Sequence, residues 1–467
     1  MNEIIKPNLS NFIKSLRDFG YNFQIALADI VDNSIAAESK NILIETESDP
    51  NAKLSILDDG FGMLEEELIE AMRLGSKDPE DEREKKDLGR FGLGLKTASF
   101  SQCKRLTVIS KKNSEISCRR WDLELIIEKN EWLLITPEFN EFENDNLFKK
   151  LATQKSGTLV IWEKIDTIHK SEYAEEIILL RSHLALVFHR FLEGNIKGRK
   201  FFMSLNNNEI KGFNPFNENN LATQTLPDQI IKVNNKRIKI TPYILPHHSK
   251  LSNLEYDKYA TTDGYTKSQG FYLYRGGRLL IHGTWWGLNK ISDAHRLIRI
   301  RVDISNDQDS IWNIDVKKSI AYPNSLIKNE LKKVLNNILN RGQNVYSRRP
   351  QILDDKSVLP FWNVTHTDGA VKFRLNQSHP LLECLKETIK KEEDLVLNTY
   401  LKGVEAYIPI TAIEAYVITE PKKINQKDLI EEQEKKKLLN SLLNLDLTKE
   451  QIESLLKTEL FKELREE

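Results

Sequence analysis

Three short motifs within residues 29–97 constrain this 467-residue chain more than any other feature of its sequence. The first lies in the segment 21–40, YNFQIALADIVDNSIAAESK, whose apolar residues recur at helical spacing. Asp29, Asn33 and Ala37 are four residues apart, so a helix places them on one face. The carboxylate and the amide then point toward one spot, while the intervening isoleucines face the core.

The second motif follows two expected strands, NILIETE at 41–47 and the apolar segment that begins at residue 54. It has the sequence Asp58-Asp59-Gly60-Phe61-Gly62-Met63. The two glycines permit positive φ or a close approach of another backbone, and they leave an acidic side chain at the strand end.

The third motif is a glycine-rich loop that enters a helix. A charged stretch at residues 76–87, SKDPEDEREKKD, precedes it and is expected to be a solvated, mobile loop that can also serve as a lid. Such a loop and the start of its helix offer backbone N–H groups to an anion. The glycine-rich loop lacks the preceding strand and the acidic residue that accompany a dinucleotide-binding fingerprint. It also lacks the GK[ST] ending of a P-loop. Its residues are Gly89, Arg90, Phe91, Gly92, Leu93, Gly94, Leu95, Lys96 and Thr97.

Each motif alone is more often structural than functional, but their order and spacing resemble the GHKL ATPase superfamily of gyrase, heat-shock chaperones, sensor histidine kinases and MutL. The family's ExxxNxxDA helix motif lies over 29–37, its DxGxG motif over 58–62 and its glycine loop over 89–94. Gly157-Thr158 in SGTLVIWEKID resembles its fourth element. AMRLGSK and GRFGLGLKTAS look most like MORC ATPases and their MutL-like prokaryotic relatives.

The resemblance implies an α+β fold with several domains. We expect a GHKL-type α/β sandwich ATPase domain at 1–195 and a transducer-like α/β domain at 196–345. The second is strand-rich, with Asn-Asn and Gly-Gly pairs at hairpin turns, and is similar to transducers in LPHHSKL, QGFYLYRGGRLL and IDVKKSIAYP. A small mixed α/β module at 346–420 and a helical tail at 421–467 follow, where the likeness is thin.

The resemblance also implies ATP and magnesium as ligands. Asn33 would hold magnesium through its amide oxygen, and Asp58 would accept the adenine amino group, with Thr158 holding a bridging water. The loop amides from Gly89 to Gly94 would cradle the phosphates, with Lys96 adding positive charge. The other residues expected around the nucleotide are Ala37, Gly60, Gly62, Met63, Arg90, Phe91, Leu93 and Leu95.

Asp29 stands where the family carries glutamate, the base that orients the attacking water. Aspartate is one methylene shorter, which retracts the carboxylate by roughly 1.5 Å. Errors of about 1 Å can cost about 100-fold in rate, so either the backbone compensates or hydrolysis is slow and the chain is a long-lived ATP switch. Asp32 is expected to be a surface or capping carboxylate, and Ala36 replaces the family's second acid.

A transducer lysine reaches the γ-phosphate in MutL-like and gyrase-like relatives. Lys317 and Lys318 follow the expected strand SIWNIDV, and we favour Lys318 for this catalytic role. A contact made only with ATP would bias how the two domains dock.

The composition suits a soluble globular chain, 40% hydrophobic and 29% charged. With 68 Lys and Arg against 69 Asp and Glu, a uniformly basic nucleic-acid coat is excluded, though RLIRIRV, KGRK and YSRRP leave local contact with nucleic acid open. Three scattered cysteines exclude a disulfide framework, and no apolar run reaches the roughly 18 residues of a membrane span. We therefore expect a cytoplasmic protein.

The leading functional hypothesis is an ATP-dependent conformational switch. ATP would order the lid, dock the transducer and close two protomers into a homodimeric clamp that acts on DNA or DNA-bound partners. The prokaryotic relatives suggest a restriction-like or antiviral defence setting, with any cutting left to a nuclease or helicase partner. A non-hydrolysing ATP-binding scaffold, a heat-shock-type chaperone and a phosphotransferase remain alternatives; the last lacks a recognisable phosphoacceptor helix.

Overall fold

A computed structural model describes residues 8–18, 20–48, 52–75, 94–196, 198, 200–233, 236–261, 264–315, 318, 320–347, 358–367, 370–419, 426–445 and 447–465. The chain divides into two compact units. The first extends to His247 and resumes at Asp257–Gln343, and the second comprises His248–Tyr256 and the chain from Asn344 onward.

The amino-terminal part of the first unit is built on a seven-stranded mixed sheet with the order β4-β3-β5-β2-β1-β6-β7. Its pairs are antiparallel except for β1 and β6, which run parallel. The strands are β1 Asn41–Glu47, β2 Lys53–Asp58, β3 Cys103–Lys112, β4 Glu115–Asp122, β5 Gly157–Ile165, β6 Phe202–Leu205 and β7 Asn208–Glu209.

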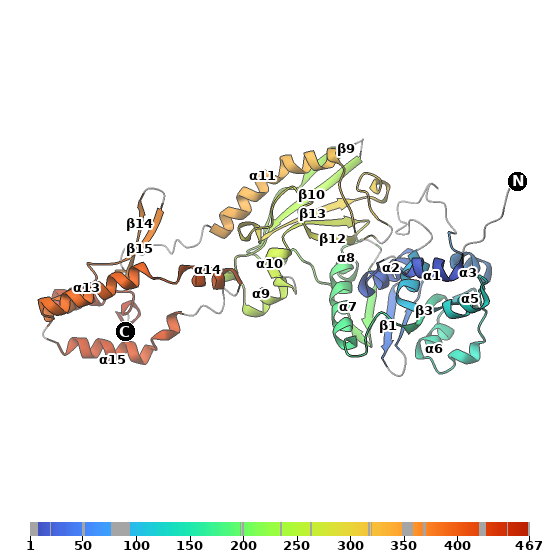
Figure 1. Cartoon of the computed structure of the whole chain (residues 1–467), viewed down its shortest axis with the longest axis horizontal. Helices are drawn as coiled ribbons and strands as arrows, with labels where there is room; N and C mark the ends of the chain where they lie inside the picture. The colour runs from blue at the N-terminus through green and yellow to red at the C-terminus, as the bar shows by residue number, and fades with distance from the viewer. Residues whose placement is uncertain are drawn as a thin grey trace. The chain divides into compact units, whose positions relative to one another are not determined.

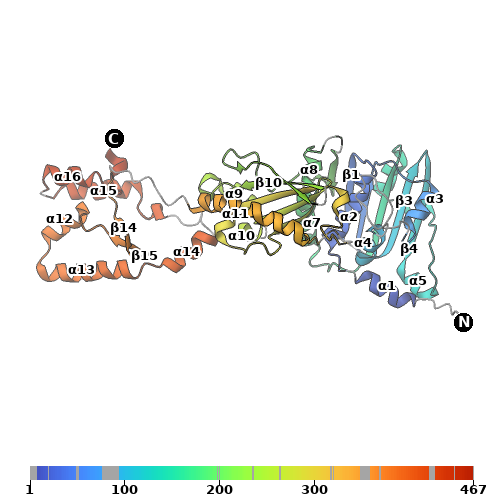
Figure 2. The same ribbon diagram turned by 90° about the horizontal axis from the view of Figure 1, so that it is seen from above.

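Helices cover both faces of this sheet (Figures 1 and 2). Because side chains alternate along a strand, Leu54 and Ile56 of β2 pack on one face with α2 and α4, whereas Leu57 packs on the other with Leu147 of α6. The helices of this domain are α1 Leu9–Arg17, α2 Phe23–Ala36, α3 Glu65–Met72, α4 Gly94–Gln102, α5 Leu123–Lys129, α6 Asn146–Thr153, α7 Tyr173–Val187 and α8 His189–Leu192. The expected α+β class is confirmed.

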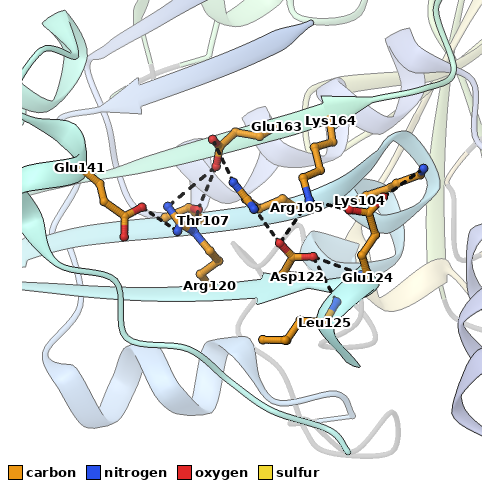
Figure 3. A network of polar contacts seen from close by, with 10 residues as sticks. All are labelled: Lys104, Arg105, Thr107, Arg120, Asp122, Glu124, Leu125, Glu141, Glu163 and Lys164. Atoms are coloured by element: carbon orange, nitrogen blue, oxygen red, sulfur yellow. Dashed lines mark hydrogen bonds and ion pairs between the residues drawn. The ribbon is translucent and has the colours of Figure 1, made fainter. Parts of the chain in front are cut away.

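An ion-pair network crosses strands β3, β4 and β5 (Figure 3). Asp122 of β4 accepts from Arg105 Nε at 2.8 Å and lies 3.5 Å from Lys164 Nζ of β5. Glu163 bridges Arg105 and Arg120 at 3.8 and 3.9 Å. Burial works against ionisation of Asp122, but these cations hold its pKa below the usual aspartate value. The network therefore joins three neighbouring strands through their side chains as well as their backbones.

The boundary expected at residue 195 falls inside this domain. The next two strands, β6 and β7, extend the first sheet, because Asn41–Ile44 of β1 pair with Phe202–Leu205. The pairing partner of a short strand cannot be identified from local sequence, so the sequence analysis placed β6 and β7 in the following domain.

A second sheet forms the middle domain of the same unit, with the order β12-β11-β13-β10-β8 and β9 beside β10. The 23-residue helix α11, Ser325–Ser347, covers it through Ile327, Leu331 and Leu335. The strands are β8 Gln224–Thr225, β9 Gln229–Val233, β10 Lys236–Ile244, β11 Gly270–Arg275, β12 Arg278–Thr284 and β13 Ile298–Ile304. Two short helices, α9 Asn253–Ala260 and α10 Gly264–Lys267, precede β11.

The predicted Gly-Gly hairpin is confirmed between β11 and β12. Arg275 pairs with Arg278, and Gly276 and Gly277 have φ of 57° and 95°, as a tight hairpin turn requires. A Cβ on Gly277 would lie 2.9 Å from Ile196 Cδ1, so the turn sits directly against the amino-terminal domain. The hairpin thus carries Arg278 to the boundary between the two domains.

The second unit combines the expected module and the expected tail. A β-bridge between Leu359 and Thr458 joins them, and Leu455 and Phe461 are buried. Its elements are β14 Trp362–Thr367, β15 Ala370–Leu375, α12 Pro380–Thr388, α13 Lys391–Ala406, α14 Ile410–Thr419, α15 Glu432–Leu443 and α16 Lys449–Leu455. Among the residues given above, no helix has the length and apolar character that a bilayer crossing needs.

Candidate nucleotide-binding site

A row of three polar side chains crosses the face of the first sheet that packs against α2 and α4. Asp58 of β2 pairs with Thr158 of β5, which pairs in turn with Ser110 of β3. Alternation places Asp58 on the same face as Leu54 and Ile56, toward α2. The structure therefore brings Asp58 and Thr158 together as the sequence analysis expects, and it adds Ser110.

Hydrogen bonds orient the Asp58 carboxylate, which is 5% exposed. Its Oδ2 accepts from Ser34 Oγ of α2 at 2.9 Å, and its Oδ1 accepts from the Gly60 N–H at 2.9 Å. Burial raises the pKa of Asp58, although these hydrogen bonds oppose the shift. Thr158 Oγ1 lies 2.9 Å from Ser110 Oγ, which also accepts from Met63 N–H at 2.9 Å. The Asp58 carboxylate can therefore accept a hydrogen bond from an exocyclic amine, and the hydroxyls of Thr158 and Ser110 can hold a water beside it.

The two glycines after Asp58 are required by close packing. A Cβ on Gly60 would lie 2.6 Å from Ala37 Cβ, at the carboxyl end of α2. Gly62 has φ +64°, and its Cβ would lie 2.0 Å from the Lys111 carbonyl oxygen. The DxGxG segment is therefore wedged between α2 and β3, which fixes the position of Asp58 relative to α2.

Helix α2 divides its polar residues between two environments. Asn22 caps its start by accepting from Ile25 N–H at 2.8 Å. Asn33 is exposed, whereas Asp29 and Asp32 are 2% and 1% exposed. Asp32 was expected at the surface, and the structure buries it because the middle domain covers that side of the helix.

The exposed Asn33 side chain carries an amide oxygen, a ligand type that fits a magnesium ion arriving with a nucleotide. Magnesium keeps several waters and usually takes one or two protein ligands besides phosphates. Within the described part of the chain, no group of three or more His, Cys, Asp or Glu side chains is arranged to hold a metal by itself. Asn33 can therefore supply one ligand to a metal held mainly by phosphates.

Two cations from the middle domain meet the two buried acids of α2. Arg278 Nη2 lies 3.3 Å from Asp29 Oδ1, and Nη1 lies 2.9 Å from Asp32 Oδ2. Lys318 Nζ lies 3.3 Å from Asp29 Oδ1 and 2.6 Å from Asp32 Oδ2. Tyr21 donates from its hydroxyl to Asp29 Oδ2 at 3.0 Å. We call Asp29, Asp32, Arg278 and Lys318 the acid–base cluster; its formal charges balance.

Burial and the neighbouring charges shift the pKa values of Asp29 and Tyr21. Burial raises the pKa of Asp29, while Lys318 and Arg278 oppose that shift. Burial and then the Asp29 charge raise the pKa of Tyr21, which keeps its hydroxyl a donor. Both Asp29 oxygens thus have partners in this structure, and a water can use Asp29 as a base only where one of them is released.

The phosphate side of the expected site is described only in part. Gly89, Arg90, Phe91, Gly92 and Leu93, as well as Lys317, lie outside the described residues. Gly94 and Leu95 begin α4, and a Cβ at Gly94 would meet no atom within 4 Å among the residues that the structure describes. Lys96 is buried and donates from Nζ to the Ala71 carbonyl at 2.8 Å, so its contact with phosphate stays a prediction.

Sequence reasoning missed Arg278, Tyr21, Ser34 and Ser110. Ser110 follows Leu106 and Val108 at alternate positions of β3, so strand periodicity could have placed it on the core face. Arg278 gave no such signal, because a cation after a Gly-Gly turn usually faces solvent.

Comparison with known proteins agrees with this geometry. Residues 21–158 match the family described as histidine kinase-, DNA gyrase B-, and HSP90-like ATPase. ATPase morc-1 of Caenorhabditis elegans is 31% identical over 108 residues, which is 23% of this chain and 12% of that protein. ATPase MORC2B of Mus musculus is 32% identical over 97 residues, which is 20% of this chain and 9% of that protein.

The matched region contains Asp29, Asn33, Asp58 and Thr158, and it ends at the last of them. These matches support an ATP-binding ATPase domain at the amino-terminal end of the chain. Residues 21–158 are thus a GHKL-type ATPase domain, and this part of the assignment is MORC-like, because both relatives named above are MORC ATPases.

Proposed function

We propose that the chain binds and hydrolyses ATP with magnesium and uses the cycle as a conformational switch. The observation that carries the proposal is the convergence of α2 and β2, where Ser34 donates to Asp58 at 2.9 Å and Asn33 stays exposed on the same helix. A buried, oriented carboxylate suits the adenine amino group, and an exposed amide suits a metal on the phosphates.

The residues divide the chemical work. Asp58 accepts from the adenine amino group, and Thr158 with Ser110 holds a water beside it. Asn33 binds magnesium, which neutralises phosphate charge when present. Asp29 orients the attacking water and takes its proton once a cation of the acid–base cluster has moved.

ATP binding is proposed to close two copies of the chain into a dimer. Lys318 comes from the middle domain, so a contact with the γ-phosphate would change how that domain is held on α2. Action on DNA or DNA-bound partners, and a prokaryotic defence setting, rest on the resemblance to MORC-like and MutL-like ATPases. DNA-stimulated phosphate release would support that role, and suppression of client aggregation would instead favour a chaperone.

Size-exclusion chromatography with light scattering tests nucleotide recognition and closure together. The full chain is run with magnesium and either no nucleotide, ADP or a non-hydrolysable ATP analogue. We expect doubling of the mass with the analogue alone, and no doubling in Asn33→Ala. A wild-type mass that stays constant while the analogue binds would reject the clamp.

A non-hydrolysing scaffold is the second candidate, favoured by the short Asp29 side chain and its full set of partners. Steady-state phosphate release separates the two functions. Release clearly above the Asn33→Ala background supports an ATPase, whereas equal release with intact ATP binding supports the scaffold.

A further inference from the structure

The two cations of the acid–base cluster are held in different ways. Arg278 is 4% exposed, begins a paired strand, and its guanidinium carbon lies 5.8 Å from the centre of the Phe188 ring. Lys318 is 12% exposed at its side chain, lies outside the helices and strands, and has φ +55°. A planar guanidinium in a strand is pre-organised, whereas a lysine on a loop has a long flexible stem.

The two acids also differ. Asp32 lies 2.6 and 2.9 Å from the two cations, whereas both cations lie 3.3 Å from Asp29. Asp32 is therefore the tightly paired acid and Asp29 the loosely paired one. Asp32 Oδ1 and the Nε and Nη1 atoms of Arg278 have no hydrogen-bond partner in the described residues, although Nη1 lies 2.9 Å from Asp32 Oδ2, so the pair depends on charge attraction and not on hydrogen-bond geometry.

Charge balance restricts what can leave the cluster. Departure of Lys318 leaves Arg278 to neutralise Asp32, and a buried acid keeps a partner. Departure of Arg278 would likewise leave one cation for two buried acids, so charge balance allows only one cation to leave and does not choose between them. Lys318 is the one that can leave, because it is the more exposed cation and lies on a loop, whereas Arg278 is almost fully buried in a paired strand.

We propose that Arg278 and Asp32 form a fixed ion pair that positions Asp29, and that Lys318 is the exchangeable member, which holds Asp29 without nucleotide and releases it on reaching the γ-phosphate. The exchange rests on the proposed function. Arg278 is thus a positioning residue that stays on α2 through the cycle, and one lysine both detects ATP and unmasks the base.

The fixed pair is tested first in nucleotide-free protein. Unfolding equilibria are measured for Arg278→Gln, Asp32→Asn and the double variant. We expect each single change to lower the free energy of unfolding. The double variant should lose less than the two single losses added together, by at least tenfold in the unfolding equilibrium constant, which corresponds to about 1.4 kcal/mol. Additive effects would overturn the pair.

Nucleotide binding and turnover then separate the roles of the two cations. Fluorescent ATP and ADP analogues give affinities, and phosphate release gives kcat and KM. Lys318→Gln should weaken ATP at least tenfold and leave ADP within threefold. Arg278→Gln should leave both affinities within threefold and lower kcat at least tenfold, with Arg278→Lys recovering part of that loss.

Arg190 provides a matched control, because it pairs with Asp303 of β13 at another contact between the same domains. Arg190→Gln should leave kcat and both affinities within threefold. An Arg278→Gln variant that loses ATP but not ADP affinity would overturn the positioning role and make Arg278 a phosphate ligand. Wild-type protein that binds no ATP would overturn the proposed function and the lysine exchange. The unfolding measurements on the Arg278 and Asp32 variants without nucleotide would still decide whether the fixed pair exists.

Discussion

Gly62→Ala tests whether close packing after β2 fixes the position of Asp58 in the proposed adenine site. Gly62 has φ +64°, where a side chain costs roughly 1–2 kcal/mol. Its Cβ would also lie 2.0 Å from the Lys111 carbonyl oxygen and 2.9 Å from the carbonyl carbon, both backbone atoms of β3. Overpacking of this kind costs about 1–3 kcal/mol, so we expect a total loss of roughly 2–5 kcal/mol.

Gly75 is the matched control, because it has φ +71° but no atom of the described residues within 4 Å of an added Cβ. Gly75→Ala should cost only the roughly 1–2 kcal/mol of the backbone conformation. Hydrogen exchange of the β2 and β5 amides measures both losses in the native chain, and titration with an ATP analogue measures affinity. We expect weaker ATP binding in Gly62→Ala alone. Equal stability losses and equal affinities would refute the close-packing argument.

Four further predictions concern the polar residues of the proposed nucleotide site. Asn33→Ala should change stability by less than about 0.5 kcal/mol, because the side chain is exposed, but lower ATP affinity with magnesium at least tenfold; unchanged affinity in calorimetry would contradict the metal role. Asp29→Ala should retain ATP binding and lose phosphate release, so that dimers accumulate with ATP in light scattering. Asp29→Glu should equal or exceed wild-type release because it restores the family's reach, and complete loss would mean that the site is built around aspartate. Because the folded-state pKa of Asp58 is raised, the folded chain binds the extra proton, so stability should fall as pH rises through the interval above the ordinary aspartate pKa. ATP affinity should weaken as pH falls through the same interval, and an identical pH profile in Asp58→Asn would contradict this assignment.

Local sequence pattern predicts much of the fold around α2. The helical spacing of 21–40, the strand alternation of 41–47 and the Gly-Gly turn all reappear as expected, because each is determined by residues close in the chain. The sequence also predicts that Asp58 and Thr158 lie together, because one is at the end of its strand and the other at the start of the neighbouring strand.

The acid–base cluster could not be predicted in this way. Asp32 and Arg278 meet only because the middle domain covers α2, and no periodicity encodes a contact between residues so distant in sequence. A solvent-facing Asp32 is the better expectation for a lone amphipathic helix, but α2 is enclosed on almost every side. Lys318 is expected to reach a phosphate, and that role stays a prediction; in the structure its Nζ lies 3.3 Å from Asp29 Oδ1.

The pairing of β6 with β1 has a practical consequence for dissecting the chain. A fragment that stops at residue 195 lacks β6 and β7, so the backbone N–H and C=O groups of β1 that face Phe202–Leu205 lose their partners. An uncapped β-edge beside the apolar Ile42 and Ile44 invites pairing between copies, and such a fragment would self-associate for reasons unrelated to ATP. Fragments that retain the strands through Glu209 keep that edge covered.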